Sequence, residues 1–203
     1  MKIFCIGRNY AAHARELQNE VPSDPLIFMK PKNALLQKDE PFYYPDFTRN
    51  LQYECELVIQ MCKNGKYIDK KYAYRYYDKI GLGIDFTARD VQLRLKNAGH
   101  PWELAKAFDQ SAVLGEMLSI SEMEAEAPFT FRLEKNGEIV QQGDAANMIF
   151  SVDEIVAYIS KFFTLNIGDL IYTGTPAGVG AVQIGDQLEG YLEKKKMFTV
   201  EIK

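Results

Sequence analysis

The sequence predicts a mixed α+β fold that is rich in β-strands and has helices at its periphery. Most apolar segments are short and alternate or run unbroken as strands do, whereas few have helical periodicity. The strands do not alternate regularly with helices, as they would in a parallel βαβ sheet. The chain has 203 residues, of which 47% are hydrophobic, and this suits a single domain over residues 1–203 with a sizeable core.

The predicted strands follow one another along the whole chain. They cover residues 2–6, 26–30, 53–61, 80–86, 128–134, 138–143, 168–173, 187–192 and 197–202. Asn136 and Gly137 stand between two of these apolar segments, and this dipeptide is a strong signal for a two-residue hairpin turn. The sequence therefore predicts that the two strands on either side of it pair in antiparallel fashion.

The predicted helices are fewer. They cover residues 8–17, 69–77, 87–97 and 151–163. The last begins with a capping box, Ser151 followed by Glu154, and the third begins with a similar pattern, Thr87 followed by Asp90. Residues 18–25 are polar and flanked by prolines, which predicts a mobile surface loop.

Composition excludes several classes of partner. The formal net charge of −4 argues against nucleic acid or an anionic membrane surface as the main partner. No apolar run is long enough to span a membrane, and polar residues follow the N-terminus at once, which predicts no signal peptide. The three cysteines, at positions 5, 55 and 62, predict free thiols in a reducing, cytoplasmic compartment.

Carboxylates are the most informative side chains of the sequence. Glu54 and Glu56 lie two residues apart in a predicted strand and so share one face, where like charges repel. Asp85 ends another apolar segment. Three carboxylates without Cys or His suit a hard cation, which would be Mg²⁺, Mn²⁺ or Ca²⁺. The alternatives are an exposed strand face for the glutamates and a residue near a helix N-terminus for Asp85.

A histidine and two lysines could act beside such a site. His13 and Glu16 are helical neighbours at i and i+3, and a carboxylate can raise the basicity of a histidine that serves as a general base. An ordinary surface pair is the alternative. Lys106 lies among apolar residues and could supply positive charge to an enolate, and Lys30 has a similar setting. Solvated lysines are the alternative for both.

The loop from Tyr172 to Gly180 ends a strand in a Gly- and Pro-rich turn. Such loops can present backbone N–H groups to an anion. It lacks the lysine and the spacing of a nucleotide-binding P-loop, and a plain turn is the alternative.

Several strings, taken in order, resemble the fumarylacetoacetate hydrolase family, and within it the short acylpyruvate-hydrolase-like members. The strings are Gly7-Arg8-Asn9-Tyr10 with His13 and Glu16; Phe28-Met29-Lys30-Pro31; Arg49-Asn50-Leu51 before Glu54 and Glu56; Asp85 to Gln92; Pro101-Trp102 with Leu104-Ala105-Lys106; and Thr173-Gly174-Thr175-Pro176 with Gly178-Val179-Gly180. They span residues 7–180, which is nearly the whole chain.

The resemblance implies a fold and a division of roles. It implies a rolled β-sandwich or barrel-like core of the family's C-terminal-domain type, and a homodimer. It implies Mg²⁺ or Mn²⁺ bound by Glu54, Glu56 and Asp85. The resemblance assigns the other roles as follows: His13 and Glu16 activate water on a lid, Lys106 assists catalysis, and Arg89, Gln92, Thr175 and Lys30 contact the substrate.

The activity implied by the resemblance is metal-dependent hydrolysis of a C–C bond in an acylpyruvate, a short 2,4-dioxo acid, giving pyruvate and a carboxylate. Oxaloacetate decarboxylation or tautomerisation, and isomerisation of 2-hydroxyhepta-2,4-diene-1,7-dioate, are alternatives that also pass through an enolate. A non-catalytic metal-binding module is an alternative of another class. His13, Glu16 and Lys106 argue against it, because binding a metal would not require them.

Overall fold

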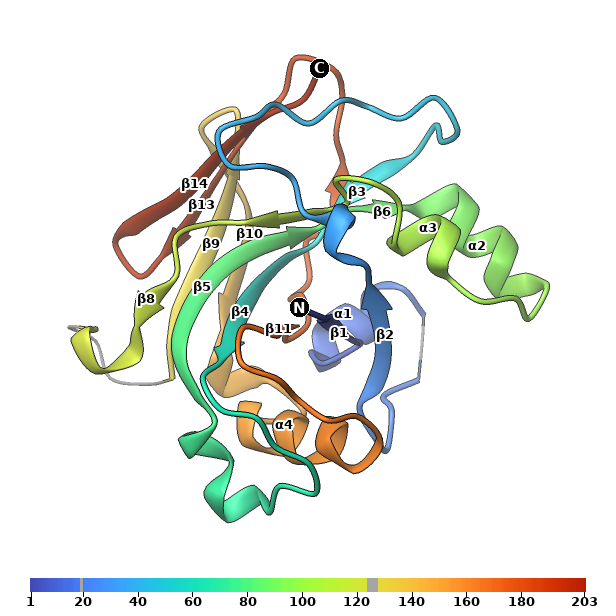
Figure 1. The fold of residues 1–203 in the computed structure, drawn as a ribbon. Coiled ribbons are helices and arrows are strands. Elements are labelled where there is room, and N and C mark those ends of the chain that lie inside the picture. Colours follow the sequence, from blue (N-terminus) through green and yellow to red (C-terminus); the bar gives the residue numbers. More distant parts are fainter. Residues whose placement is uncertain (19, 124–127) are drawn as a thin grey trace.

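The computed structural model describes residues 1–18, 20–123 and 128–203, and a strongly curled sheet dominates them (Figure 1). Within these residues the sheet has seven strands, in the order β2-β1-β11-β4-β5-β7, with β8 also paired to β5. The strands are β1 (Ile3–Gly7), β2 (Leu26–Lys30), β4 (Cys55–Met61), β5 (Tyr77–Asp85), β7 (Ala112–Leu114), β8 (Leu118–Ser119) and β11 (Leu170–Tyr172). This strand-rich architecture confirms the predicted fold class.

Two smaller sheets complete the β-structure of the described residues. One has the order β10-β9-β13-β14 and the other β12-β3-β6. The strands are β3 (Leu51–Tyr53), β6 (Thr87–Ala88), β9 (Thr130–Lys135), β10 (Glu138–Asp144), β12 (Gly180–Ala181), β13 (Gln187–Leu192) and β14 (Lys195–Glu201). Asn136 and Gly137 join β9 to β10 with φ values of 55° and 83°, as a type I′ turn requires. The predicted hairpin is therefore confirmed.

The helices lie at the periphery of the sheets (Figure 1). The α-helices are α1 (Ala11–Glu16), α2 (Arg89–Asn97), α3 (Glu103–Lys106) and α4 (Val152–Phe162), and the 3₁₀ helices are η1 (Lys32–Ala34), η2 (Lys70–Arg75), η3 (Ile120–Glu122) and η4 (Ala145–Asn147). None of the described helices is long and apolar enough to cross a membrane.

The two predicted capping boxes have different outcomes. In α4, Ser151 and Glu154 make both reciprocal hydrogen bonds of the box. The box predicted for α2 is wrong, because the side chain of Asp90 instead accepts hydrogen bonds from the hydroxyl of Thr48 and the backbone N–H of Arg49. Asp90 thus ties the start of α2 to the loop before β3.

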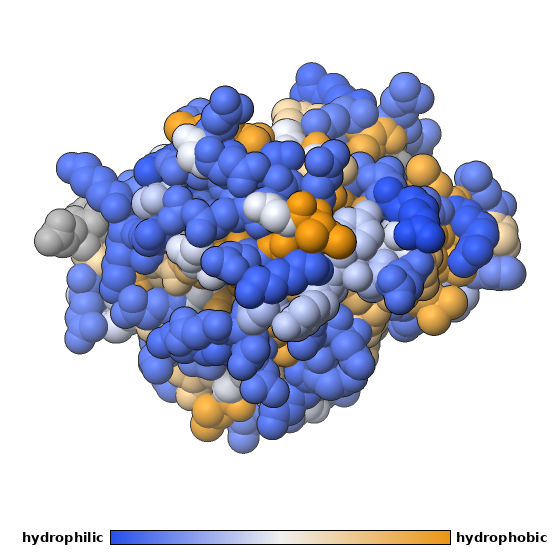
Figure 2. Space-filling model, turned by 90° about the horizontal axis from the view of Figure 1, so that it is seen from above, coloured by the Kyte–Doolittle hydropathy of each residue, from blue (hydrophilic) through white to orange (hydrophobic). Residues whose placement is uncertain are grey.

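The main core lies between the curled sheet and the four-stranded sheet. Side chains from both sheets fill it, among them Leu57, Leu82, Ile84, Phe131, Leu133, Leu188 and Val200. Against the same face of the curled sheet, farther along β4, α4 packs Ile155, Val156 and Ile159 into a second buried cluster that includes Ile59 and Ile171. The face seen from above is mostly hydrophilic, with smaller apolar areas between the polar side chains (Figure 2).

Strand direction brings distant segments to one edge of the curled sheet. β1 and β11 are parallel, so the segments that follow them emerge at the same edge. β4 is antiparallel to β11 and β5 is antiparallel to β4, which places the start of β4 and the end of β5 at that edge as well. The α1 helix, residues 173–180, the first residues of β4 and the last residue of β5 therefore meet there.

Candidate metal and substrate site

Three carboxylates converge at this edge. Glu54 lies just before β4, Glu56 lies within it, and Asp85 is the last residue of β5. The backbone N–H of Asp85 donates to the carbonyl oxygen of Glu54 at 2.8 Å, which fixes the two strands side by side. All three residues are buried, and one oxygen from each lies within 4.8 Å of the others. The structure thus brings the three predicted metal ligands together.

Buried cations surround the carboxylates. Lys106, at the end of α3, places Nζ 2.7 Å from Glu54 Oε2 and 2.8 Å from Asp85 Oδ2. Arg89, the first residue of α2, forms an ion pair with the other oxygen of Glu54. Its Nε and Nη1 donate to Gln52 and Gln92 at 2.7 and 2.5 Å. The Lys106 ammonium and Arg89 guanidinium therefore offset part of the negative charge.

Lys30 is buried beside Asp85. Its Nζ is 2.8 Å from Asp85 Oδ1, and its side chain is fully buried. It also donates to the carbonyl oxygens of Lys106 and Ser111 and to the Ser111 hydroxyl. These partners engage the ammonium within the protein, and the expected contact of Lys30 with substrate stays a prediction. Lys30 holds Asp85 and the segment around Lys106 in place.

The environment drives the pKa values of the two glutamates in opposite directions. Burial raises the pKa of Glu56 well above its usual range, and the negative charges of Asp85 and Glu54 raise it further. Burial alone would also raise the pKa of Glu54, but Lys106 and Arg89 outweigh it and lower that pKa. Burial would lower the pKa of Lys106, yet Asp85 and Glu54 raise it, so Lys106 stays charged.

The donor set fits a hard divalent cation. The group found among the described residues consists of three buried carboxylates, which are the oxygen donors that Mg²⁺ and Mn²⁺ prefer. Asp85 Oδ1 accepts no well-aligned hydrogen bond from the described residues, although Lys30 Nζ is close to it. A buried acceptor without such a bond is costly, and a cation would satisfy it.

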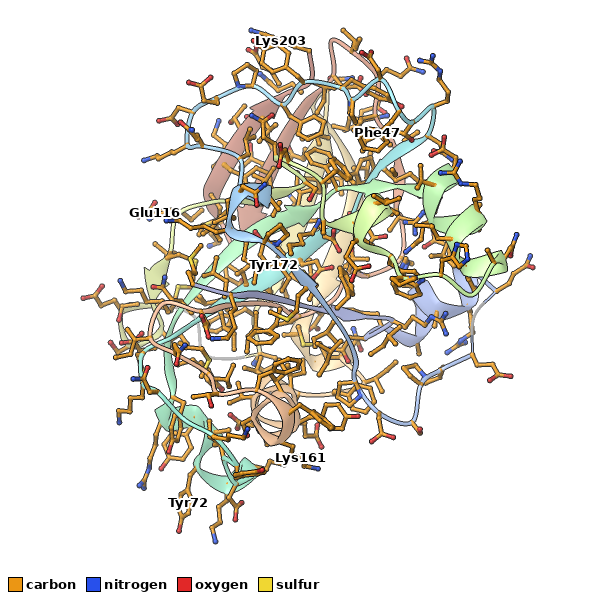
Figure 3. The ribbon with its side chains drawn as sticks, turned by 45° about the vertical axis from the view of Figure 1, so that its right-hand side comes forward. Phe47, Tyr72, Glu116, Lys161, Tyr172 and Lys203 are labelled. Atoms are coloured by element: carbon orange, nitrogen blue, oxygen red, sulfur yellow. The ribbon has the colours of Figure 1, made fainter. Side chains whose placement is uncertain are left out.

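The loop after β11 holds Glu56. The backbone N–H of Gly174 donates to Glu56 Oε2 at 2.7 Å. Gly174 has a φ of 103°, and a Cβ there would lie 2.6 Å from Cβ of Asn9, so glycine is needed for both reasons. Tyr172, the last residue of β11, is fully buried near the middle of the molecule (Figure 3). The predicted anion-binding loop thus gives a backbone N–H to a carboxylate of the protein itself.

Thr175 is tied to the protein backbone. Its hydroxyl donates to the carbonyl oxygen of Cys55 at 2.8 Å and accepts from Gln141 Nε2 at 2.9 Å. Gln141, on β10, also accepts from the backbone N–H of Cys55 at 2.9 Å. Gln141 therefore connects β10 to both site segments. No sequence pattern pointed to Gln141, because a single glutamine in a strand pattern is usually solvent-exposed.

The predicted histidine–glutamate pair is present on α1. His13 Nδ1 lies 3.2 Å from Glu16 Oε2, and His13 is only 4% exposed. Glu16 is more exposed and accepts from the backbone N–H of Gly178 at 3.1 Å. Because Nδ1 faces Glu16, the other ring nitrogen, Nε2, is the one available to a ligand. The contact with Gly178 fixes α1 against the loop after β11.

One narrow cavity of about 90 Å³ joins these groups. It is lined by Gly7, Arg8, His13, Leu17, Leu26, Phe28, Glu54, Arg89, Gln92, Leu93, Lys96, Trp102 and Lys106. The wall therefore combines the candidate base, one carboxylate of the triad and several cations. Of the predicted substrate contacts, Arg89 and Gln92 line this cavity, whereas Lys30 and Thr175 do not. Arg8 belongs to the first string of the family resemblance, but its type alone did not separate it from a surface arginine.

Comparisons with known proteins agree with the fold. The family model for the C-terminal domain of fumarylacetoacetate hydrolase matches residues 2–203. The human mitochondrial oxaloacetate tautomerase FAHD1 is 41% identical over 92% of this chain and 85% of that protein. The Escherichia coli oxaloacetate tautomerase YcgM is 39% identical over 92% of this chain and 86% of that protein.

A solved structure extends the likeness to three dimensions. Fumarylpyruvate hydrolase from Pseudomonas aeruginosa, in complex with Mn²⁺ and pyruvate, is 38% identical and superimposes with a TM-score of 0.94 over 100% of this chain and 89% of that chain. Sequence identity, family model and fold lead to the same conclusion. The chain belongs to the fumarylacetoacetate hydrolase family.

Proposed function

We propose that the protein is a divalent-metal-dependent enzyme that interconverts the keto and enol forms of a short 2-oxo acid, with oxaloacetate as the substrate. The observation that carries this proposal is that His13, held by Glu16, lines the same cavity as Glu54, Arg89 and Lys106. A base, a carboxylate of the candidate metal site and two cations then face one small space. Relatives named as oxaloacetate tautomerases support the choice of reaction.

Glu54, Glu56 and Asp85 would hold the metal ion. A divalent cation held there would supply Lewis-acid stabilisation of an enolate. Gly174, through its N–H, keeps Glu56 turned toward the other two carboxylates. The ammonium of Lys30, 2.8 Å from Asp85 Oδ1, holds the Asp85 carboxylate in place.

Proton transfer falls to the histidine. His13 Nε2 removes a proton from C3 of the keto acid, and the electron pair of that C–H bond forms the C2–C3 double bond of the enolate. Glu16 keeps the ring oriented through Nδ1 and stabilises the imidazolium that results. The ammonium of Lys106 compensates the negative charge that develops on oxygen. Return of the proton to that oxygen gives the enol, and the reverse sequence gives the keto form.

Hydrolysis of an acylpyruvate is the second candidate. The same pair of residues, His13 and Glu16 (the dyad), would serve this reaction. His13 could equally take a proton from a water that attacks the 4-carbonyl carbon. Cleavage of the C3–C4 bond then yields a carboxylic acid and the enolate of pyruvate, which is protonated at carbon. The likeness to a fumarylpyruvate hydrolase supports this candidate. Both reactions share the enolate and differ in whether water takes part.

Direct assays distinguish the candidates. We expect the Mg²⁺- or Mn²⁺-loaded protein to accelerate the loss of enol-oxaloacetate absorbance, and to do so faster than it cleaves acetylpyruvate. A chelator should abolish the effect and added metal should restore it. Release of pyruvate from oxaloacetate would reveal decarboxylation, and a diene dioate would test the isomerase alternative. Failure of the loaded protein to turn over any of these compounds would contradict the proposal.

A further inference from the structure

Arg8 occupies an unusual position on the wall of the cavity. It follows β1 directly and precedes α1, with a φ of 58°, in the left-handed region that non-glycine residues seldom adopt. Such conformations concentrate at functional sites, where the surrounding structure enforces them. Here the flanking elements are fixed, because β1 is paired on both edges and Asn9 bonds to the backbone of Thr173. Arg8 is thus held on the wall of the cavity.

The guanidinium of Arg8 is unpaired within the described part of the chain. Arg89, in the same cavity, is occupied by Glu54, Gln52 and Gln92. No hydrogen bond or ion pair is found for the side chain of Arg8 among residues 1–18, 20–123 and 128–203. A guanidinium has a rigid fork of donors that matches a carboxylate in bidentate fashion. Arg8 is therefore equipped to bind an anionic group that enters the cavity.

The cavity as a whole has a cationic lining. Arg8, Arg89, Lys96 and Lys106 line it, against a single acidic residue, Glu54. This concentration of positive charge occurs in a chain whose formal net charge is −4. A concave site lined by one sign of charge raises the local concentration of ligands of the opposite sign. Arg89 and Lys106 are bound to the carboxylates of the triad, whereas Arg8 is separate from them.

We propose that Arg8 binds the distal carboxylate of a 2-oxo dicarboxylic acid and thereby selects such substrates over 2-oxo acids with an uncharged end. The inference rests on the proposed function in one respect, namely that the 2-oxo acid end of the substrate lies at Glu54, Glu56 and Asp85. The end of the substrate that is remote from the reacting carbon then determines specificity. It does so by contacting Arg8, which takes no part in proton transfer.

The test compares two ligands that differ in their distal end. Oxaloacetate carries a second carboxylate, and 2-oxopentanoate has nearly the same length with an apolar end. Dissociation constants for both are measured by calorimetry on the Mg²⁺-loaded protein. In Arg8→Gln we expect oxaloacetate to bind roughly tenfold to a hundredfold more weakly, as for loss of a charge-assisted hydrogen bond, while 2-oxopentanoate changes by less than about twofold. Arg8→Lys should give an intermediate loss for oxaloacetate alone.

Arg15→Gln is the matched control. Arg15 is an exposed arginine on α1 that does not line the cavity, so the same loss of charge there should leave both constants unchanged. Equal weakening of both ligands in Arg8→Gln, or no weakening of either, would overturn the proposal. If Arg8→Gln fails to fold, as thermal melting would reveal, Arg8→Lys decides by the same criterion. Absence of oxaloacetate turnover in the unchanged protein, with binding of the dicarboxylate still dependent on Arg8, would refute the proposed reaction and not this subsite.

Discussion

Lys106 shows how a single residue can serve two opposing purposes. Its ammonium compensates Glu54 and Asp85, which lie 2.7 and 2.8 Å away, and so permits three carboxylates to be buried together. The same charge repels a cation that binds the same oxygens. Removal of a carboxylate and removal of this lysine should therefore change metal affinity in opposite directions.

The first prediction concerns Glu56→Ala. We expect Mg²⁺ and Mn²⁺ to bind at least about a hundredfold more weakly, because even residues that only support metal ligands contribute about tenfold to a hundredfold. Calorimetry with both metals measures the change. Lys106→Met is the opposing control and should bind the metals more tightly while losing turnover, since it removes a nearby positive charge and keeps all three ligands. Unchanged affinity in Glu56→Ala would contradict the assignment of the metal site.

The second prediction concerns the dyad. His13→Ala should lower kcat/KM for tautomerisation and for acylpyruvate hydrolysis by about 10²–10⁴-fold, the usual contribution of a general base. Any decarboxylation of oxaloacetate should fall far less, because it needs no base to remove a proton from carbon or water. Glu16→Gln should have a smaller effect than His13→Ala, because the amide still contacts the ring. The values of kcat/KM are measured for each substrate and each variant at a saturating concentration of the metal.

Two results would count against this role. Equal slowing of all three reactions in His13→Ala would mean that His13 positions the substrate or α1 and does not transfer a proton. A larger loss of kcat/KM in Glu16→Gln than in His13→Ala would mean that the contact between Glu16 and Gly178 matters more than the contact between Glu16 and His13.

At the scale of elements, the loop after β11 depends on one backbone conformation. Gly174→Ala places a Cβ against Asn9 at a φ of 103°, so we expect a lower melting temperature and weaker metal binding, because the N–H that holds Glu56 must shift. Gly168→Ala is the matched control, since it too has a positive φ, of 82°, but has open space around it. Similar losses in both variants would show that backbone strain alone, and not the approach to Asn9, is responsible.

The α1 helix is the element best placed to respond to ligand. It is short, has no side-chain cap at its N-terminus, and is tied to the rest of the protein by Glu16 and Gly178. We expect its amides to exchange hydrogen rapidly in the free protein and more slowly with Mg²⁺ and oxalate, a mimic of the pyruvate enolate. Equal, strong protection of the α1 amides with and without ligand would contradict a closure of α1 over the ligand. The adjoining segment 18–25 stays a prediction as a mobile lid, and residue 19 lies outside the described residues.

Elements with strong local signals were predictable from the sequence. The capping box of Ser151 and Glu154 and the turn at Asn136 and Gly137 both form, because their partners are within a few residues. The box at Asp90 does not form, because Thr48 and Arg49 compete for its carboxylate from a distant segment. The three-stranded sheet of β3, β6 and β12 was missed, since strands of two or three residues have no readable periodicity.

For the molecule as a whole, the sequence supplied the types of residues at the site but not their arrangement. The spacing of Glu54 and Glu56 suggested a shared face, whereas their approach to Asp85 depends on the antiparallel pairing of β4 and β5. Lys30 was a candidate from the sequence, but its partners, like those of Gln141, could not be predicted for the same reason. Their roles consist of contacts made across the fold, such as the bond from Gln141 to Thr175. The homodimer stays a prediction that sedimentation velocity can test.

The pairing of β1 with β11 has a consequence for how the chain folds while it is being synthesised. Ile3 lies beside Leu170, so one edge of β1 has no partner while most of the chain is still being synthesised. β2 can pair with the other edge early, since it follows within the first 30 residues. The contact between Glu16 on α1 and the backbone N–H of Gly178 can form only after β11 has left the ribosome. Nascent chains are therefore expected to expose an open strand edge, which chaperones would have to protect, until the last quarter of the chain arrives.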